Sequence, residues 1–573
     1  MSDAHGGPKT FLGKYVFSMD HKVIGIQYLI TAMAMAVVAG LLALVIRTQL
    51  AFPGLGHEVK PETYLSIVTM HGTLMVFFVI SLGLVSGFGN WLIPLQVGAR
   101  DMAYPLLNML SYWVTVPACF LMLASFFVEG GAAAAGWTSY PPLSALPQAV
   151  PGSGLGTTLW LLAMALFIVS ITMGSLNYLT TILNCRAPGM SMMRMPLAVW
   201  TYLISSVLGL LAFPALTAAA IMLLFDRHLG TSFFLPSGMV FGGHVLPNMG
   251  GTPLLFQHLF WFLGHPEVYV LVLPAIGLTF EVLAAFTRRP PFGYRSSVYS
   301  MLVVAVLSVI VWGHHMFTTG MDPRIGEYFS VVTVMITIPF AVLGLNLVAS
   351  LWRADLRLAA PMMYAIGVIS AVGIGGLGGL YLGTAASDMY FHDSYFVVGH
   401  FHFTIGTVTF LSLFAGITFW FPKMFGRKLN ETASQLHFWL TMVPMFTMFL
   451  LMHYQGMGGL LRRTYDTSVY EYNVGSRWMM VPISVLAFVT FGAQLIFLAN
   501  FFGSALFGKK VESDNPWQAT TLEWSTPTPP PHGNWPGAVP VVERGPYDYA
   551  SHPGADYVLQ AQAQMAAPVG ASA

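Results

Sequence analysis

The sequence predicts an all-α membrane protein, built as a bundle of twelve transmembrane helices. Two observations predict this class. First, 56% of the 573 residues are hydrophobic and only 8% are charged, whereas soluble chains carry roughly a quarter charged residues. Second, apolar runs of about 20 residues, the length that crosses a bilayer, recur between short Pro- and Gly-rich loops. The expected spans are 23–46, 66–93, 104–127, 156–182, 197–224, 252–284, 297–318, 328–351, 362–384, 394–420, 436–459 and 478–506.

Charge and cysteine content exclude several classes of protein. A net charge of +1 argues against a nucleic-acid partner. Cys119 and Cys185 form no CxxC pair, so disulfides and thiolate metal sites are not expected. The first 20 residues show no pattern of a cleavable signal. Most of the 24 Lys and Arg residues fall in segments on the same side of the membrane as the N-terminus. This bias predicts that both termini are cytoplasmic.

The chain divides into a helical part and a tail. Residues 1–510 hold all twelve expected spans, and residues 511–573 are rich in Pro, Gly and Ala. This composition predicts an extended or disordered cytoplasmic segment. The alanine-rich tail, together with a departure in the eighth span described below, favours a bacterial cytoplasmic (inner) membrane.

The sixth span contains ionisable residues that are costly to bury, in the stretch Trp261–Tyr269. Such groups in a membrane indicate function by default. His265 and Tyr269 are four residues apart and share a helix face, whereas Glu267 lies about 200° round the helix from His265. This layout favours a metal ligand beside a phenol, with a carboxylic acid aimed at another cavity.

Six of the 17 histidines sit inside the expected spans in a meaningful pattern, at similar depth in the outer half of the membrane: His71, His265, His314, His315, His400 and His402. One buried histidine is usually a hydrogen-bonded core residue. Six at similar depth favour metal ligation, because it holds many imidazoles in lipid at low cost.

Helical geometry divides these histidines between metals. His400 and His402 are about 200° apart, so they can hold two centres on opposite faces of their helix. His314 and His315 could close a three-nitrogen site with His265, which suits copper or iron. His71 pairs with one histidine of the tenth span. A macrocycle with two axial imidazoles suits electron transfer, and one with a single axial ligand keeps an open face for a small molecule.

The residues now resemble subunit I of the haem-copper oxidases, of the cytochrome c oxidase type, from about residue 10 to 510. The motifs are WFLGHPEVY (261–269), VWGHHMFTTGMD (311–322), HDSYFVVGHFHF (392–403), GFGNWLIPLQVGARDMAYPLLN (87–108) and NCRAPGM (184–190).

The resemblance implies two haems and a copper ion inside the bundle. His71 and His402 would bind the low-spin haem (heme a), and His400 the high-spin haem (heme a3). His265, His314 and His315 would bind the copper (CuB). In the family, Tyr269 is covalently joined to His265 and supplies an electron and a proton for O–O cleavage.

Further residues match the family's cofactor contacts. Arg462 and Arg463 match the pair that holds haem propionates, with a buried structural salt bridge as the alternative. His392 and Asp393 match a magnesium site completed by subunit II, and are otherwise loop-polar residues. Arg47 resembles the arginine that bonds the formyl group of haem A. Trp137 resembles a tryptophan near the propionates.

Asp101, Asn90, Asn108 and Asn177 match the D pathway, a proton route that ends at Glu267. The alternative for Asp101 is a solvated loop aspartate. Burial predicts that Glu267 is protonated at rest.

The second family route, the K pathway, is altered. Pro339 is followed by Phe340 and Leu343, which cannot pass protons. One candidate to replace this proton route is Glu281, together with Tyr299 or Thr337. The alternative is that Glu281 only pairs with Arg288 or Arg289.

The expected function is the catalytic subunit of a terminal oxidase, a cytochrome c oxidase that reduces O2 to water and pumps protons. Expected partners are subunit II with its two-copper centre, subunit III, and cytochrome c or another respiratory complex. A nitric oxide reductase, a quinol-fed oxidase, and a haem-bearing carrier or gas sensor are alternatives. Tyr269 argues against the reductase, and a second metal argues against the carrier. The electron donor and the haem type, A against O or B, stay open.

Overall fold

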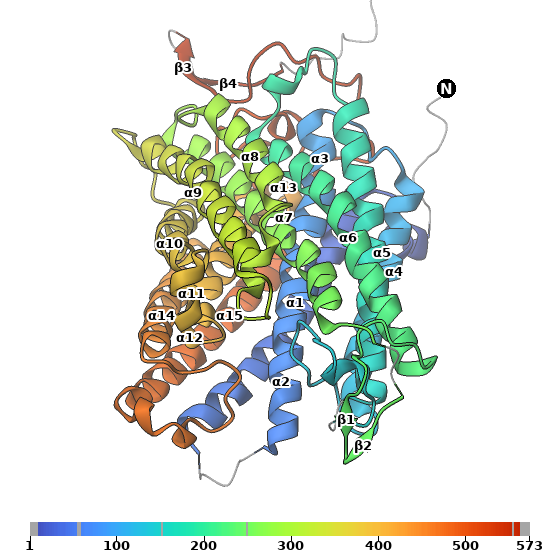
Figure 1. The fold of residues 1–573 in the computed structure, drawn as a ribbon. Helices are drawn as coiled ribbons and strands as arrows, with labels where there is room; N and C mark the ends of the chain where they lie inside the picture. Colours follow the sequence, from blue (N-terminus) through green and yellow to red (C-terminus); the bar gives the residue numbers. More distant parts are fainter. Residues whose placement is uncertain (1–9, 54–58, 150–152, 248–249, 553–554, 562–573) are drawn as a thin grey trace, which may run out of the picture.

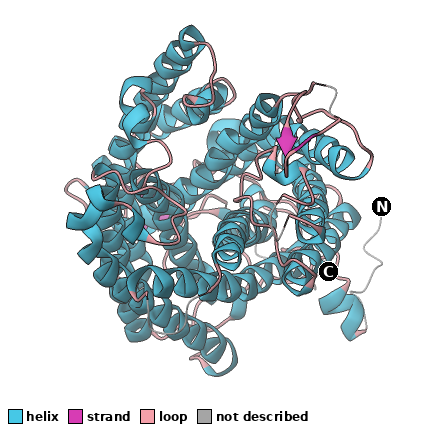
Figure 2. Ribbon diagram, turned by 60° about the horizontal axis from the view of Figure 1, so that its bottom comes forward, coloured by secondary structure: helices cyan, strands magenta, loops and turns pink. Residues whose placement is uncertain are grey.

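The computed structural model describes residues 10–53, 59–149, 153–247, 250–552 and 555–561. Within these residues the chain is a bundle of helices (Figure 1). Its longer helices are α1 (His21–Ala51), α2 (Pro61–Thr73), α4 (Pro105–Ala124), α5 (Leu155–Asn184), α6 (Leu197–His228), α7 (Pro253–Thr287), α8 (Tyr294–Ser308), α9 (Pro323–Leu351), α10 (Ala360–Leu382), α13 (Val408–Phe425), α14 (Glu431–Met457) and α15 (Met480–Phe507). Shorter helices are α3 (Gly89–Val97), α11 (Ala385–Phe391) and α12 (Tyr395–Phe401). Figure 2, tilted by 60°, shows the helices packed side by side.

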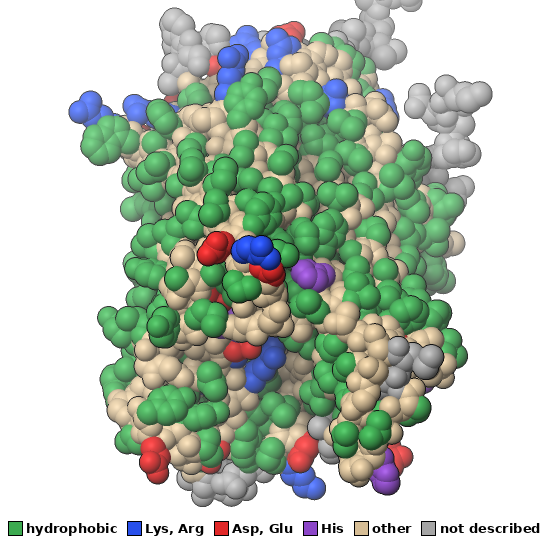
Figure 3. All heavy atoms as spheres, viewed as in Figure 1, with side chains coloured by type: hydrophobic (Ala, Val, Ile, Leu, Met, Phe, Trp, Pro, Cys, Tyr) green, Lys and Arg blue, Asp and Glu red, His purple; other side chains and the backbone are tan. Residues whose placement is uncertain are grey.

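The expectation of an all-α membrane protein is confirmed. Over the described residues, eleven helical segments are long and apolar enough to cross a membrane. The segment α8 is the shorter twelfth element, at the place of the expected span 297–318. Hydrophobic side chains cover the sides of the face seen in Figure 3, while Lys and Arg side chains gather at its upper end. This distribution is what lipid around the helices requires.

The helix at α8 ends earlier than the sequence predicts. It stops at Ser308, and the chain turns through a 3-10 segment, η6 (Trp312–Met316), instead of continuing as one helix. Gly313 in this turn packs against the ring of Phe329, where an added methyl group would lie 2.3 Å from the ring. Within this segment the Nε2 atoms of His314 and His315 lie 3.1 Å apart.

Two spans contain π-helical segments beside expected metal ligands. The segment η2 (Leu74–Phe88) follows α2, and η7 (His402–Thr407) begins at His402 itself. Wider helical turns of this kind recur at functional sites, because they rotate a side chain out of the regular register.

The helix α7 is the most enclosed span, with 89% of its most apolar window buried. It packs against α6, α13, α8 and η6. Because α7 is apolar on every side, it is suited to the interior of a bundle. The polar residues of the stretch Trp261–Tyr269 are therefore held between other helices.

The C-terminal segment packs across one end of the bundle (Figure 1). It has little regular structure: a 3-10 turn, η10 (Leu522–Ser525), and the hairpin β3 (Asp548–His552) with β4 (Ala555–Val558). Yet Glu523, Trp524 and Asn534 are fully buried. Lys423, buried at the end of α13, donates to the carbonyl groups of Asp514 and Thr526. The segment therefore contributes to the packed interior at this end.

The remaining elements are short. Between α6 and α7 lies the hairpin β1 (Val240–Phe241) with β2 (His244–Val245). The remaining helical segments are η1 (Leu12–Val16), η3 (Ser125–Phe127), η4 (Leu143–Ala145), η5 (Met192–Arg194), η8 (Thr467–Val469) and η9 (Glu471–Met479).

Candidate active site

One large cavity of about 970 Å³ lies inside the bundle. All six intramembrane histidines line it: His71, His265, His314, His315, His400 and His402. Its walls are mostly apolar, with a few convergent polar groups, which is the usual character of a cofactor site. Residues far apart in the sequence therefore meet at one enclosed place.

The structure brings His265, His314 and His315 together. One ring nitrogen of each residue lies within 4.8 Å of the others. The Nε2 atoms of His314 and His315 are 3.1 Å apart, and Nδ1 of His265 is 3.3 Å from Nε2 of His315. The three imidazole nitrogens converge on one place. This donor set fits copper or another transition metal.

Neighbouring side chains fix the orientation of this cluster. The hydroxyl of Thr333 lies 2.9 Å from Nδ1 of His314, which leaves Nε2 as the inward nitrogen. The indole of Trp261 stacks on His315, with ring centroids 3.9 Å apart and planes inclined by 13°. Such outer contacts usually set the ring orientation of metal-binding histidines.

The other three histidines share one hydrogen-bond pattern. Nδ1 of His71 lies 2.9 Å from the carbonyl of Ala39, Nδ1 of His400 lies 2.9 Å from that of Gly375, and Nδ1 of His402 lies 2.8 Å from that of Val398. Since a carbonyl can only accept, Nδ1 carries the proton and Nε2 keeps its lone pair. Each ring thus offers Nε2 as a ligand, and the cavity provides space for planar macrocycles, so these residues fit haem iron.

Tyr269 and Glu267 differ in their surroundings. The ring of Tyr269 packs edge-on against His265 at a centroid distance of 4.8 Å. Oε1 of Glu267 accepts a hydrogen bond from Ser81 at 3.1 Å, while Oε2 is buried and has no hydrogen-bond partner in the part of the chain that the structure describes. A buried carboxyl with one unused oxygen is unusual, and it is suited to hold or pass on a proton.

Cationic and aromatic residues border the same cavity. Arg47, Trp137, Arg462 and Arg463 all line it. Trp137 packs edge-on against Trp261 at 5.8 Å, and Gly136 leaves room for the guanidinium of Arg463. Burial lowers the pKa of Arg462 to about 10, so this side chain stays charged at neutral pH. These cations are positioned to hold carboxylates of a bound group.

Arg47 has partners of its own. Its guanidinium donates to the hydroxyl of Ser484 at 3.0 Å and to the carbonyl of Met480 at 3.2 Å. These contacts fix its position at the wall of the cavity.

His392 and Asp393 lie at the cavity edge. Nδ1 of His392 lies 2.8 Å from a carboxylate oxygen of Asp388, and Asp393 lies 3.7 Å from Arg462. Burial lowers the pKa of His392, but contact with the carboxylate of Asp388 raises it, and the net result is a raised pKa. The sequence reading missed Asp388, which the i, i+4 spacing from His392 could have indicated.

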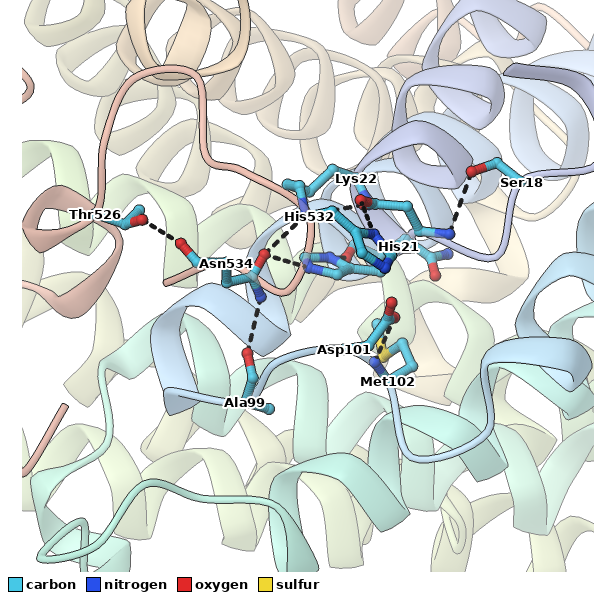
Figure 4. Close-up of polar contacts among 11 residues, drawn as sticks. Ser18, His21, Lys22, Ala99, Asp101, Met102, Thr526, His532 and Asn534 are labelled. Carbon is cyan, nitrogen blue, oxygen red and sulfur yellow. Dashed lines mark hydrogen bonds and ion pairs between the residues drawn. The ribbon is translucent and has the colours of Figure 1, made fainter. Parts of the chain in front are cut away.

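The predicted proton route begins at Asp101, in the loop between α3 and α4 (Figure 4). Burial, and then the nearby carboxylate of Asp20, raise the pKa of Asp101 to about 7. The tail covers this place: the amide of Asn534 accepts from Lys22 at 2.8 Å and lies 3.0 Å from His21. Asp101 is therefore a partly enclosed carboxyl rather than a freely solvated one.

The three predicted asparagines have different roles in the structure. The side chain of Asn177 forms two hydrogen bonds with the backbone of Tyr104: Oδ1 accepts from the amide at 3.0 Å, and Nδ2 donates to the carbonyl at 3.0 Å. Asn108 is buried with neither amide atom bonded. Asn90 donates to the hydroxyl of Tyr178 and to the carbonyl of Ser86. Unpartnered buried amides indicate ordered water.

Glu281 is not placed with the partners that the sequence suggested. Tyr299 is 56% exposed on α8, Arg288 pairs with Asp556 at 2.7 Å, and Arg289 contacts the carbonyl of Trp352. Thr337 lines the large cavity.

The contacts of Glu281 are instead with the start of α6 and with the tail. Its Oε1 accepts from the backbone of Ala198 at 3.2 Å and from the hydroxyl of Tyr547 at 2.6 Å. Ala198 lies in the first turn of α6, so Glu281 caps that helix.

Several buried polar residues were missed by sequence reasoning: Tyr28, Ser81, Ser86, Ser111, Ser170 and Tyr178. Ser81 contacts Glu267 directly, and the others line a second, small cavity. In the sequence, each of these residues shows only as a hydroxyl inside an apolar run. Such a hydroxyl commonly bonds to the backbone of the preceding helical turn, so the pattern does not indicate a functional site.

Comparisons with known proteins agree with this geometry. Residues 23–506 match the family model "Cytochrome C and Quinol oxidase polypeptide I". The chain is 44% identical to the alternative cytochrome c oxidase subunit 1 of Bradyrhizobium diazoefficiens, over 97% of this chain and 94% of that protein. It is 42% identical to cytochrome c oxidase subunit 1 of Thermostichus vulcanus, over 93% and 92% of the two chains.

A solved structure shares the fold. A haem-copper terminal oxidase dimer determined by cryo-EM superposes with a TM-score of 0.69, covering 86% of this chain and 85% of that chain at 19% identity. The family match spans most of the chain, and the curated relatives align almost end to end. The chain therefore belongs to the cytochrome c and quinol oxidase polypeptide I family, and is the haem- and copper-binding catalytic subunit of a respiratory oxidase.

Proposed function

We propose that the chain reduces O2 to water as the catalytic subunit of a cytochrome c oxidase and couples this reaction to proton pumping. One observation carries the proposal: the three-histidine cluster, with Tyr269 beside it, shares a cavity with three histidines that each offer a free Nε2. Relatives named cytochrome c oxidase subunit 1 support the choice of donor.

Each side chain has a defined task in this proposal. His71 and His402 would hold a low-spin heme a, and His400 a high-spin heme a3. His265, His314 and His315 would hold copper. When bound, these groups supply electron storage and O2 binding. Tyr269 holds a transferable proton on its hydroxyl beside His265, and the apolar walls keep bulk water away from the reacting centre.

The remaining predicted contacts are part of the same proposal. Arg462 and Arg463 hold haem propionates, with Trp137 packed near them, and Arg47 contacts the formyl group of heme a. His392, oriented by Asp388, and Asp393 bind magnesium together with subunit II. Subunit III and cytochrome c are the other expected partners. The location is a bacterial inner membrane with both termini cytoplasmic.

Protons travel from Asp101 past Asn90 and Asn108 to Glu267. The raised pKa of Asp101 supports a protonated inlet near neutral pH, and the single hydrogen bond of Glu267 supports proton release at the far end. Asn177 acts by fixing the backbone that follows Asp101. The contacts of Glu281 favour a helix cap, and its use as a second inlet stays a prediction.

The test is gas consumption by the purified, cofactor-loaded complex. With reduced cytochrome c as donor, we expect O2 to be consumed, at four electrons per O2, with acidification outside proteoliposomes. Consumption of NO in place of O2 would overturn the proposal in favour of a nitric oxide reductase. Turnover with quinol but not cytochrome c would identify a quinol-fed oxidase. Bound haem without turnover of either gas would indicate a carrier or sensor.

A further inference from the structure

Tyr178, on α5, contacts Asn90, a residue of the predicted proton route. Its side chain is 3% exposed, and its ring fits against the backbone of α3 only because residue 89 is glycine. A methyl group at Gly89 would lie 2.7 Å from the tyrosine ring. The ring brings its hydroxyl to Asn90, from whose Nδ2 it accepts a hydrogen bond at 2.7 Å, and it donates to the carbonyl of Ser86 at 3.1 Å.

This contact decides how the amide of Asn90 is turned. The two hydrogens on its Nδ2 are both used, one on the carbonyl of Ser86 at 2.8 Å and one on Tyr178. The hydroxyl of Tyr178 gives its proton to the carbonyl of Ser86, so it can receive only the nitrogen of the amide, as a carbonyl does. The oxygen Oδ1 is therefore directed away from both, and it is buried without a partner among the described residues.

A small cavity of about 10 Å³ adjoins these groups. This volume is close to the minimum that admits one water. Its polar lining includes Ser86, Asn90, Ser111, Ser170 and Tyr178, together with Tyr28, whose hydroxyl is 3.0 Å from that of Ser111. A buried acceptor beside a polar cavity of this size is a binding place for water.

We propose that Tyr178 is a positioning residue of the proton inlet, which fixes the amide of Asn90 so that Oδ1 holds a water between Asp101 and Glu267. The inference rests on the proposed function, because it concerns how protons reach Glu267. Tyr178 is not itself a relay, since its hydroxyl proton points at a backbone carbonyl, which passes no proton onward. Its action is through Asn90.

The test is Tyr178→Phe, which keeps the ring and removes the hydroxyl. The matched control is Tyr202→Phe. Tyr202 is equally buried on the neighbouring helix α6, lies 6.4 Å from Tyr178 ring to ring, and donates to the carbonyl of Leu84 at 2.9 Å. It does not line the small cavity. Both variants lose one hydroxyl in the same packing environment, so a purely structural effect would be shared.

Proton uptake from the inner side is measured with a pH-sensitive dye during a single reaction of the reduced complex with O2, in H2O and in D2O. We expect Tyr178→Phe to slow uptake about threefold, the size of effect that loss of one positioning hydrogen bond produces, and to enlarge the solvent isotope effect. Tyr202→Phe should match the parent. Equal uptake in the two variants would overturn the proposal.

Two further variants make each outcome decisive. If Tyr178 acts through Asn90, Asn90→Ala and the double variant Asn90→Ala/Tyr178→Phe should be equally slow. Additive slowing would reject that route. Asp101→Asn tests the underlying proton route separately: if it leaves uptake unchanged, the proposed route from Asp101 to Glu267 fails, whereas slow uptake in Asp101→Asn with normal uptake in Tyr178→Phe rejects only the role of Tyr178. Unchanged haem spectra verify folding in every variant.

Discussion

The helix α7 carries two buried glutamates whose surroundings are opposite. Glu267 lines the large cavity, receives one hydrogen bond from Ser81, and has an oxygen with no partner. Glu281, fourteen residues further along, receives the backbone of Ala198 and the hydroxyl of Tyr547 on one oxygen. The two share a helix and lie within about 40° of the same face. Their partners differ, and this decides what each can do.

A carboxyl with few partners can gain or lose a proton without breaking a network, and so it is fit for proton transfer. A carboxyl that accepts hydrogen bonds from the first turn of a helix takes the place of an N-terminal cap and stabilises that helix. The helix α6 begins after Pro196, with no side-chain cap of its own, and Glu281 takes the place of that cap. Burial alone therefore does not mark a proton carrier.

The largest expected effect separates the two residues. Glu267→Gln should lower O2 consumption by about 100-fold, the scale of a lost acid-base group, with haem and copper contents unchanged. Oxygen electrode rates and metal analysis provide the measurement. Full activity in this variant would remove Glu267 from the route and erase the contrast with Glu281.

Glu281→Ala should affect stability instead. Loss of the oxygen that caps the start of α6 is worth about 1 kcal/mol, so the loaded complex should melt at a lower temperature while the rate of haem reduction stays normal. Tyr547→Phe should also lower the melting temperature, because both variants lose the contact between Tyr547 and Glu281. Slowed haem reduction in Glu281→Ala, with an unchanged melting temperature, would show that Glu281 is an inlet after all.

A pH dependence of stability is expected at the other end of the route. The pKa of Asp101 is raised from 3.8 to about 7 when the protein folds. Between these values the folded state binds more protons than the unfolded state, so this residue makes stability fall as pH rises from about 4 to about 7. Asp101→Asn should remove that part of the slope in melting curves recorded from pH 5 to pH 8. An unchanged slope would mean that Asp101 is solvated.

The large features of this protein could be predicted from single residues and their spacing. Low charge and recurrent apolar runs gave the membrane bundle, because lipid permits few backbone arrangements. Histidines in apolar runs indicated the cavity, since buried imidazoles need a partner. The pairing of His265 with Tyr269 followed from helical spacing. The turn at η6 could not be predicted, because the packing of Gly313 against Phe329 involves a different helix.

What the sequence determined by itself was therefore the fold class and the residue types able to hold haem and copper. Both follow from local composition and from the spacing of residues along the chain. What only the tertiary structure decided was the use of each polar residue: Glu267 facing a cavity, Glu281 capping α6, and Asn90 turned by Tyr178. The reason is physical, because the hydrogen-bond partners of a buried polar group come from segments distant in the chain, and spacing along one helix carries no information about them.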